Sequence, residues 1–183
     1  GIVAFHEMSG SCDHAVLRAL DHDAFPLDVF ASAGGDDAPA SFDGRRGHLR
    51  GVKLFLDGSL GGRSAALLEP YGTMPHTRGF LRYDRATLRG LVRDAAARGL
   101  PSWIHAIGDA AVREALDACA TAPGLRHRIE HAQFVHPDDV PRFAALGVVA
   151  SVQPAHLLDD APAVVRELGT RSGRAFPLRA LLR

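Results

Sequence analysis

The chain has 183 residues, of which 46% are hydrophobic and 23% are charged, and this is enough apolar material for one sizeable core. Its 21 Lys and Arg balance its 21 Asp and Glu, and no basic run is long enough to bind a phosphate backbone. No apolar run approaches the roughly 18 residues of a membrane span. From the balanced charge we expect no nucleic acid as a partner, and from the short apolar runs we expect no membrane.

Short apolar runs alternate along the chain with longer segments of helical spacing. The alternation predicts strands over residues 2–5, 26–31, 51–56, 101–106, 127–131 and 148–152, and helices over residues 12–21, 84–98, 110–120, 137–146 and 177–182. A Gly- and Pro-containing passage over residues 57–80 is too long for an ordinary connection and is a candidate functional loop. Repeated βα units predict a parallel sheet with right-handed crossovers, either an open doubly wound sheet or a (β/α)8 barrel.

The cysteines and the first residues set two further expectations. Cys12 and Cys119 lie far apart without CxxC spacing, which argues against a disulfide framework or a thiolate metal site and favours the reducing cytoplasm. The opening GIVAFHEM has neither the layout of a signal peptide nor an initiator Met. We therefore expect a segment of a longer protein.

Polar side chains stand at the C-terminal ends of several apolar runs, where barrel enzymes gather their chemistry. They are His6, Asp57, His105, His131 and Gln153. In an open sheet only the strands beside a switch point would meet, and a glycine fingerprint would usually mark the first of them. The stretch DGSLGGR matches neither GxGxxG nor a Walker sequence, so the pattern favours a barrel.

The stretch WIHAIGDAAVREAL delivers His105 at the end of a predicted strand, followed by a tight turn at Gly108 and a helix. Asp109 falls at or next to the helix N-cap, where it can accept backbone N–H bonds or orient an imidazole. The next unit, RIEHAQ, repeats the arrangement with His131 after Glu130. Two imidazoles on adjacent strands suit a divalent ion such as zinc; the alternative is that each is an ordinary strand-end histidine.

The remaining histidines divide into two groups. His6 and His156 can line the same barrel mouth as the strand-end pair. The others occupy helical, loop or flanking positions and are expected to be solvated; they are His14, His22, His48, His76, His127 and His136.

Several longer stretches carry a family resemblance. VKLFLDGSLGGRSAALLEPY, HAIGDAAVREALDA, HRIEHAQFVHPDDVPRFAALGVVASVQP and PLRALLR resemble, in order over residues 1–183, the catalytic barrel of the metal-dependent amidohydrolase superfamily. The resemblance is specifically to its YtcJ-like branch, which is similar to N-substituted formamide deformylase and imidazolonepropionase.

The resemblance implies a set of metal ligands. His105 and His131 match the family's histidines after the fifth and sixth strands, and Lys53 matches a lysine that many members carboxylate to a carbamate bridging two metals. A carbamate supplies two anionic oxygens, whereas an ammonium would repel a cation. The resemblance thus implies one or two divalent ions, with zinc as the expected metal. Without it, Lys53 is an inward strand lysine paired with Asp57 on the same face.

Two further parts of the family pattern lie outside these residues. The first-strand HxH would precede Gly1, and the last-strand aspartate that acts as general base would follow Arg183. Residues 1–183 are therefore expected to form strands two to seven of an incomplete (β/α)8 barrel, without the flanking β-sandwich. We expect this segment to bind metal weakly and to hydrolyse little by itself, and its open sheet edges to favour self-association.

The expected function is hydrolysis of carbon–nitrogen bonds in small non-peptide amides or cyclic amides by metal-activated water. Asp57 and His156 are the candidate catalytic residues, and Arg63, Gln153 and His6 the candidate substrate contacts. Asp109 and Glu130 are expected to support the ligands. Two alternatives stay open: a non-catalytic binding or regulatory protein on the same scaffold, and an open α/β sheet that binds an anion at its Gly61–Arg63 loop, where Arg63 is otherwise a solvated loop residue.

Overall fold

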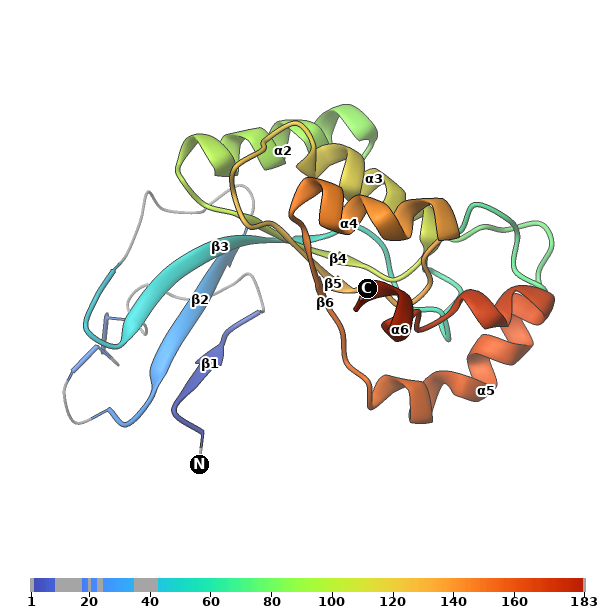
Figure 1. Ribbon diagram of the computed structural model, residues 1–183, viewed down its shortest axis with the longest axis horizontal. Helices are drawn as coiled ribbons and strands as arrows, with labels where there is room; N and C mark the ends of the chain where they lie inside the picture. Colours follow the sequence, from blue (N-terminus) through green and yellow to red (C-terminus); the bar gives the residue numbers. More distant parts are fainter. Residues whose placement is uncertain (1, 9–17, 20, 23–24, 35–42, 183) are drawn as a thin grey trace.

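The computed structural model describes residues 2–8, 18–19, 21–22, 25–34 and 43–182, and these residues form one curved parallel sheet with helices (Figure 1). The strands are β1 (Ala4–His6), β2 (Asp28–Gly34), β3 (Gly47–Phe55), β4 (Ser102–Ala106), β5 (Arg128–His131) and β6 (Val149–Ser151). Each strand pairs in parallel with the next, in the order β1-β2-β3-β4-β5-β6. A doubly wound sheet reverses its strand order, so this order excludes the open-sheet alternative and confirms the incomplete barrel.

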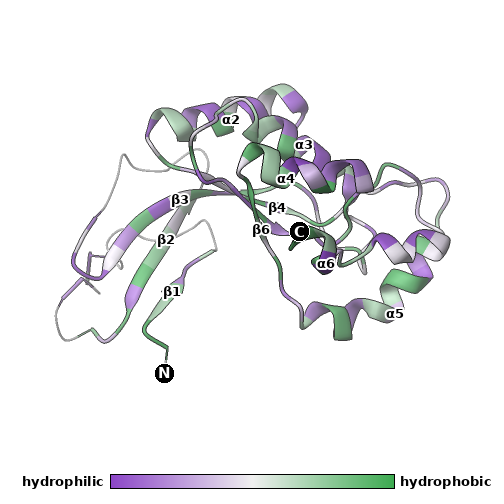
Figure 2. Ribbon diagram, viewed as in Figure 1, coloured by the Kyte–Doolittle hydropathy of each residue, from purple (hydrophilic) through white to green (hydrophobic). Residues whose placement is uncertain are grey.

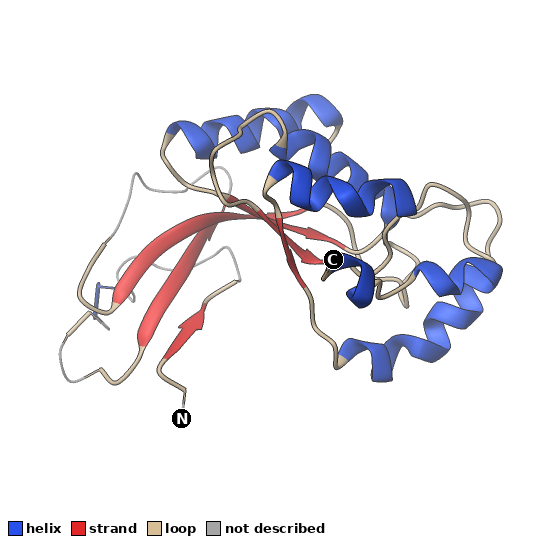
Figure 3. Ribbon diagram, in the orientation of Figure 1, coloured by secondary structure: helices blue, strands red, loops and turns tan. Residues whose placement is uncertain are grey.

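Three helices cover the convex face of the sheet, as Figure 3 shows. They are α2 (Arg85–Ala97), α3 (Asp109–Cys119) and α4 (Val140–Leu146), the last preceded by a 3-10 turn, η1 (Pro137–Asp139). Asp84 caps α2 by accepting the Thr87 N–H at 2.7 Å. Gly147, at φ 66°, ends α4 in the left-handed conformation that glycine adopts most readily.

The main core lies between the sheet and these helices because alternate strand residues point to opposite faces. On β3 and just beyond it, Val52, Leu54 and Leu56 are fully buried against the helices. Ile104 and Ile129 continue this apolar layer on the next two strands. Figure 2 shows hydrophobic residues along the strands beneath α2, α3 and α4.

The concave face carries the polar and aromatic residues of the same strands. In register, Lys53, Trp103, Arg128 and Val149 form one row, and Phe55, His105, Glu130 and Ser151 form the next. The Trp103 indole lies against Gly51, where an added Cβ would be only 2.5 Å from the ring. These two rows place chemically active side chains on the inside of the curved sheet.

A second apolar cluster lies beyond the C-terminal ends of the strands, and we call it the mouth cluster. It joins the long loop after β3 to helix α5 (His156–Leu168), and Ala175 and Phe176, just after the 3-10 turn η2 (Gly169–Arg174), pack against it. Its buried members are Leu60, Ala65, Leu67, Tyr71, Ile107, Phe134, Val164 and Leu168. A short helix, α6 (Leu178–Leu181), follows η2 near the end of the chain.

Several element predictions need correction. Helix α5 was not predicted; Pro162 inside it interrupts the helical pattern, because proline lacks an N–H for the helix ladder. Strand β3 begins at Gly47 rather than at Gly51, and most of the predicted helix over residues 12–21 lies outside the described residues. His127, expected to be solvated, is buried: it accepts the Ser102 N–H at Nδ1 and hydrogen-bonds the Ala122 carbonyl oxygen through Nε2.

Every helix in the described ranges is too short or too polar to cross a bilayer.

Candidate metal centre

His105 and His131 lie together at the C-terminal ends of β4 and β5. Their ring centroids are 4.6 Å apart, with the rings inclined at 69°. Both side chains are partly buried on the concave side of the sheet. The structure thus brings together the two imidazoles that the sequence identified as metal ligands.

The backbone at His131 explains how its ring reaches this place. His131 pairs with Ala106, which faces the helices, so a regular strand would point His131 toward the helices as well. Instead His131 has φ 74° and Ala132 has φ 41°, both in the left-handed region that non-glycine residues seldom occupy. The Ala132 N–H holds this turn by donating to the Ala106 carbonyl oxygen at 3.1 Å. Backbone strain of this kind concentrates at functional sites, and here it turns His131 toward His105.

Both imidazoles are neutral near pH 7, as metal ligands must be. Burial, together with the charges of His131 and Lys53, lowers the pKa of His105 to about 4. Burial also lowers the pKa of His131, and Lys53 and His156 lower it further. The Nδ1 atom of His131 is buried without a hydrogen-bond partner. A buried polar atom without a partner is unusual in a native protein, and this one is free to bind a cation.

Lys53 lies one row below His105 on the concave face and is 5% exposed. Its Nζ is 4.9 Å from the centre of the Phe55 ring. Burial lowers the pKa of Lys53, although the nearby Glu130 opposes this effect. A lower pKa increases the share of neutral amine, which is the form that reacts with carbon dioxide. No ion pair joins Lys53 to Asp57 within the described part of the chain, so the structure does not support the simpler reading of this lysine.

Asp57 is buried at the start of the long loop and binds three backbone N–H groups. Its carboxylate accepts from Ala66 at 3.0 Å, from Ile107 at 3.0 Å and from Gly108 at 2.9 Å. Burial raises the pKa of Asp57 to about 6, although these hydrogen bonds oppose the rise. Its Oδ1 is also 3.4 Å from Nε2 of His105. The geometry gives Asp57 a positioning role beside His105, and its proton-transfer role stays a prediction.

The turn that follows His105 is packed against the same loop. At Gly108 an added Cβ would be 2.0 Å from the Ala66 carbonyl oxygen, so only glycine fits there. Asp109, the first residue of α3, accepts the Leu68 N–H at 2.8 Å. Both residues of this turn therefore hold the long loop against the end of β4.

His156 and Gln153 both lie near His131. The His156 ring stacks on His131 with centroids 5.7 Å apart and an angle of 17°. Gln153 donates to the Ser151 carbonyl oxygen at 3.1 Å, while its own Oε1 is buried without a hydrogen-bond partner. The Gln153 side chain also acts on His131, since it raises the pKa of that imidazole against the effect of burial, so the two buried groups lie beside each other at the mouth.

The other predicted site residues have partners within the protein. His6, at the end of β1, lies beside Trp103, and its Nδ1 is 3.1 Å from Nη1 of Arg128. Glu130 is buried and pairs with Arg128 at 3.0 Å. Arg63 pairs with Glu167 at 3.0 Å. The structure therefore separates Arg63 and His6 from the group formed by His105, His131 and His156, and their substrate contacts stay predictions.

Sequence reasoning missed two residues of this region. Phe55 lies 5.7 Å from the His105 ring and is 38% exposed. Glu167 is fully buried in the mouth cluster region. The alternation along β3 was a signal for Phe55, since it points to the same face as Lys53. Glu167 had no such signal, because its helix was not predicted.

The donors fit a divalent metal in kind. Two neutral imidazoles and a buried amine with a lowered pKa suit a borderline ion such as zinc. The described residues contain no cluster of three or more His, Cys, Asp or Glu side chains placed to hold a metal. These residues therefore fit part of a metal site.

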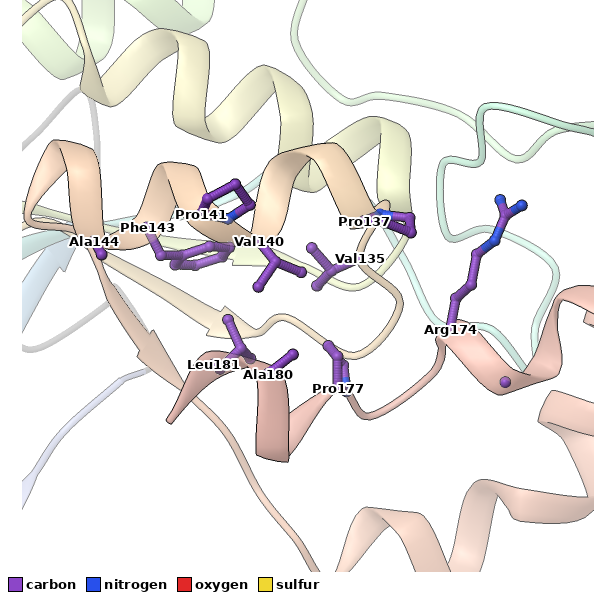
Figure 4. Close-up of a pocket in the computed structure, with 11 residues that line it drawn as sticks. Val135, Pro137, Val140, Pro141, Phe143, Ala144, Arg174, Pro177, Ala180 and Leu181 are labelled. Atoms are coloured by element: carbon purple, nitrogen blue, oxygen red, sulfur yellow. The ribbon is translucent and has the colours of Figure 1, made fainter. Parts of the chain in front are cut away.

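A large apolar cavity lies elsewhere, between α4 and the segment that contains α6 (Figure 4). Its volume is about 550 Å³, and Val140 and Phe143 face Pro177 and Leu181 across it. None of the predicted site residues lines it. The cavity is separate from the histidine group.

Comparison with known proteins gives a consistent result. Residues 7–183 match the model of a family described as the amidohydrolase family. The chain is 37% identical over 135 residues to the putative amidohydrolase YtcJ of Bacillus subtilis, covering 72% of this chain and 26% of that protein. It is 44% identical over 129 residues to protein LONG AFTER FAR-RED 3 of Arabidopsis thaliana, covering 67% of this chain and 22% of that protein.

A solved structure has the same fold. The crystal structure of an uncharacterized metal-dependent hydrolase from Pyrococcus horikoshii superposes with a TM-score of 0.85 at 34% identity, covering 98% of this chain and 38% of that one. Against the two curated relatives, YtcJ and LONG AFTER FAR-RED 3, the chain spans about a quarter of their length. The likeness to YtcJ confirms the branch that the sequence motifs indicated.

Proposed function

Because the chain belongs to the amidohydrolase family, we propose that it forms the metal-binding part of a hydrolase that cleaves carbon–nitrogen bonds in non-peptide amides or cyclic amides. The observation that carries the proposal is the meeting of two neutral imidazoles, His105 and His131, with an unpaired Nδ1 on the latter. A mouth of this kind, at the C-terminal ends of parallel strands, is where barrel enzymes place their reacting groups.

In this proposal each residue has a separate task. His105 and His131 hold a divalent ion, for which zinc is the proposed identity, and Lys53 joins them as a carbamate. The ion, when bound, supplies Lewis acidity and lowers the pKa of a coordinated water. Asp57 holds the turn that carries His105, while His156 and the free Oε1 of Gln153 face the substrate beside His131.

The proposal is tested first by metal binding. Two imidazoles alone bind divalent ions weakly, so we suggest titrating the chain with Co²⁺ and following histidine ring signals by NMR. We expect His105 and His131 signals to broaden at lower Co²⁺ concentration than the signal of His76, which is exposed. His131→Asn removes one metal ligand. In this variant the His105 signal should broaden at the same Co²⁺ concentration as the His76 signal.

The matched control is His76→Asn, which should leave the titration unchanged. Equal broadening of all three rings would contradict the metal site and favour the non-catalytic binding protein on the same scaffold. For activity, we expect the full-length gene product to hydrolyse small amides in a chelator-sensitive way. The 183-residue chain itself should show little turnover, because the described residues bring only two imidazole ligands together.

A further inference from the structure

Glu167 is a carboxylate with no exposed surface, and it joins two segments that are distant in sequence. Arg63 of the long loop binds it with two nitrogens, Nε to Oε2 at 3.1 Å and Nη2 to Oε1 at 3.0 Å. Thr73 of the same loop donates its hydroxyl to Oε2, and Arg166 donates to Oε1 at 2.8 Å. A bidentate arginine pair of this kind is specific in its geometry as well as strong.

The backbone around this pair is in equally close contact. The Gly72 N–H donates to the Glu167 carbonyl oxygen at 2.7 Å. A Cβ added at Gly72 would lie 3.2 Å from that oxygen, so the loop passes directly over the end of α5. Arg171 in η2 also donates to the carbonyl oxygens of Glu69 and Pro70. The long loop is thus fastened to the C-terminal half of α5 and to η2.

The two fastened segments carry opposite sides of the candidate site. The long loop begins with Asp57 and Gly58, and the Gly58 carbonyl oxygen is 3.4 Å from Nε2 of His105. Helix α5 begins with His156, which stacks on His131. An α-helix rises about 1.5 Å per residue, and Pro162 lies in α5 between His156 and Glu167. A shift where Glu167 is held reaches His156 through this stretch of helix.

The first turn of α5 has few contacts of its own. Leu157 is 42% exposed and Leu158 is 81% exposed, whereas Val164 and Leu168 in the second half are buried in the mouth cluster. Figure 2 shows hydrophobic residues along this helix. A hydrogen bond from the Gln133 side-chain amide to the Asp160 carboxylate, at 2.9 Å, joins α5 to the segment after β5. His156 is thus placed by two sets of contacts: its N–H donates to the Gln153 carbonyl oxygen at 3.0 Å just after β6, and the buried second half of α5 holds the other end of the helix.

We propose that Arg63 and Glu167 are positioning residues that set the place of His156 beside His131. Arg63 is thereby assigned to holding the mouth together rather than to contacting substrate. This proposal rests on the proposed function in one respect: only if the chain is part of a hydrolase does the place of His156 matter for catalysis. The placement itself can be measured without metal and without substrate.

Electrostatics supports a permanent pair. Burial by itself raises the pKa of Glu167, but hydrogen bonds from Thr73, Arg166 and Arg63 outweigh this and lower it to about 2. The carboxylate is therefore charged at neutral pH. The Glu167 side chain has no exposed surface, whereas that of Arg63 is 38% exposed. Loss of the arginine therefore leaves a buried charge without its partner, which is destabilising.

The test uses the metal-free chain with Glu167→Gln, which keeps the shape of the side chain and removes its charge. We expect the ring signals of His131 and His156 to shift, and amide exchange in α5 to become at least about tenfold faster than in the unmodified chain, with α3 unaffected. Arg63→Lys keeps the positive charge, but a lysine cannot bind the two oxygens of Glu167 with two nitrogens. It should produce the same changes to a smaller extent. This milder variant keeps the test valid if Glu167→Gln does not fold.

Asp139→Asn is the matched control. Asp139 is 2% exposed and binds Arg113 at 2.9 Å and Arg142 at 2.8 Å, but it lies among the outer helices. We expect it to lower global stability without moving the ring signals of His131 or His156. Unchanged ring signals in Glu167→Gln, or equal effects of the two variants on these signals, would overturn the proposal. A failure of Co²⁺ binding in the unmodified chain would instead overturn the metal site and leave this result intact.

Discussion

The outer layer and the mouth of this half-barrel are stabilised in different ways. In the outer layer, helices α2 to α4 pack a large apolar cluster against one face of the sheet, and the buried Asp139 pairs with Arg113 and Arg142 beside it. At the mouth, a smaller apolar cluster is combined with buried polar residues, among them Asp57, Asp109 and Glu167. The comparison teaches that the fold depends on apolar burial, whereas the arrangement of the candidate site depends on a few specific polar contacts.

The largest expected effect compares one buried leucine from each region. Leu116→Ala in α3 creates a cavity in the main core and should lower the free energy of unfolding by about 2–5 kcal/mol. Leu168→Ala in α5 should cost less globally, because the mouth cluster can open while the sheet remains folded. Urea denaturation measures the global loss, and hydrogen exchange locates it.

If Leu168→Ala lowered global stability as much as Leu116→Ala, with the same slope against urea, the two regions would form one cooperative unit. The distinction between them would then fail.

The next effect concerns pH and sharpens the description of the mouth. The pKa of His105 is lowered from 6.5 to about 4 in the folded chain, so the unfolded chain binds more protons between these values. The stability that neutral His105 contributes is present above pH 6.5 and is lost as the pH falls toward 4. Asp57, with its pKa raised from 3.8 to about 6, acts in the opposite direction over part of this range.

The His105 contribution is isolated by comparing the unmodified metal-free chain with His105→Asn. Between pH 7 and pH 5 we expect the unmodified chain to lose about 2 kcal/mol more unfolding free energy than the variant. His76→Asn, at an exposed loop position, is the control and should follow the unmodified chain. An identical pH dependence for all three proteins would show that His105 is not buried as a neutral group.

The smallest expected effect concerns the sheet edges, which belong to neither region. In the described residues β1 and β6 end the sheet, and edge strands offer unpaired backbone groups to other chains. We propose that the chain self-associates weakly through these edges. Ile2 and Val3, 77% and 74% exposed beside β1, are suitable sites for lysine substitutions that oppose such pairing.

Sedimentation velocity at several concentrations checks this proposal. The double variant Ile2→Lys/Val3→Lys should associate about tenfold more weakly than the unmodified chain. Val165→Lys, on an exposed apolar position of α5, should not change association. A monodisperse monomer for the unmodified chain at all concentrations would count against the edge model.

Much of the outer layer was predictable from local patterns. The helix over residues 84–98 was predicted within one residue at each end, because Asp84 caps it and Gly99 follows it. The strand carrying His105 was equally clear, since an apolar run precedes a Gly turn. Helix α5 was not predictable in this way, because Pro162 interrupts its pattern and its stability comes from contacts with the long loop.

Part of the candidate site was likewise predictable from local sequence patterns, and part of it was not. Histidines at the ends of adjacent parallel strands predicted that His105 and His131 would meet, and the rings are 4.6 Å apart. The sequence could not show that His131 needs a left-handed backbone to face His105, nor that Arg63 would find Glu167. Both depend on partners far away in the chain, and local patterns do not report such partners.

By itself, the sequence determined the alternation of strands and helices, the faces that are buried, and the strand ends at which reactive side chains stand. These features follow from residue periodicity and turn chemistry, which act over a few neighbouring residues. Only the tertiary structure decided which residues of the long loop and of α5 meet, and which polar atoms at the mouth are left unpaired. Such contacts depend on the burial of groups that are distant in sequence, and their energies arise only when the chain is folded.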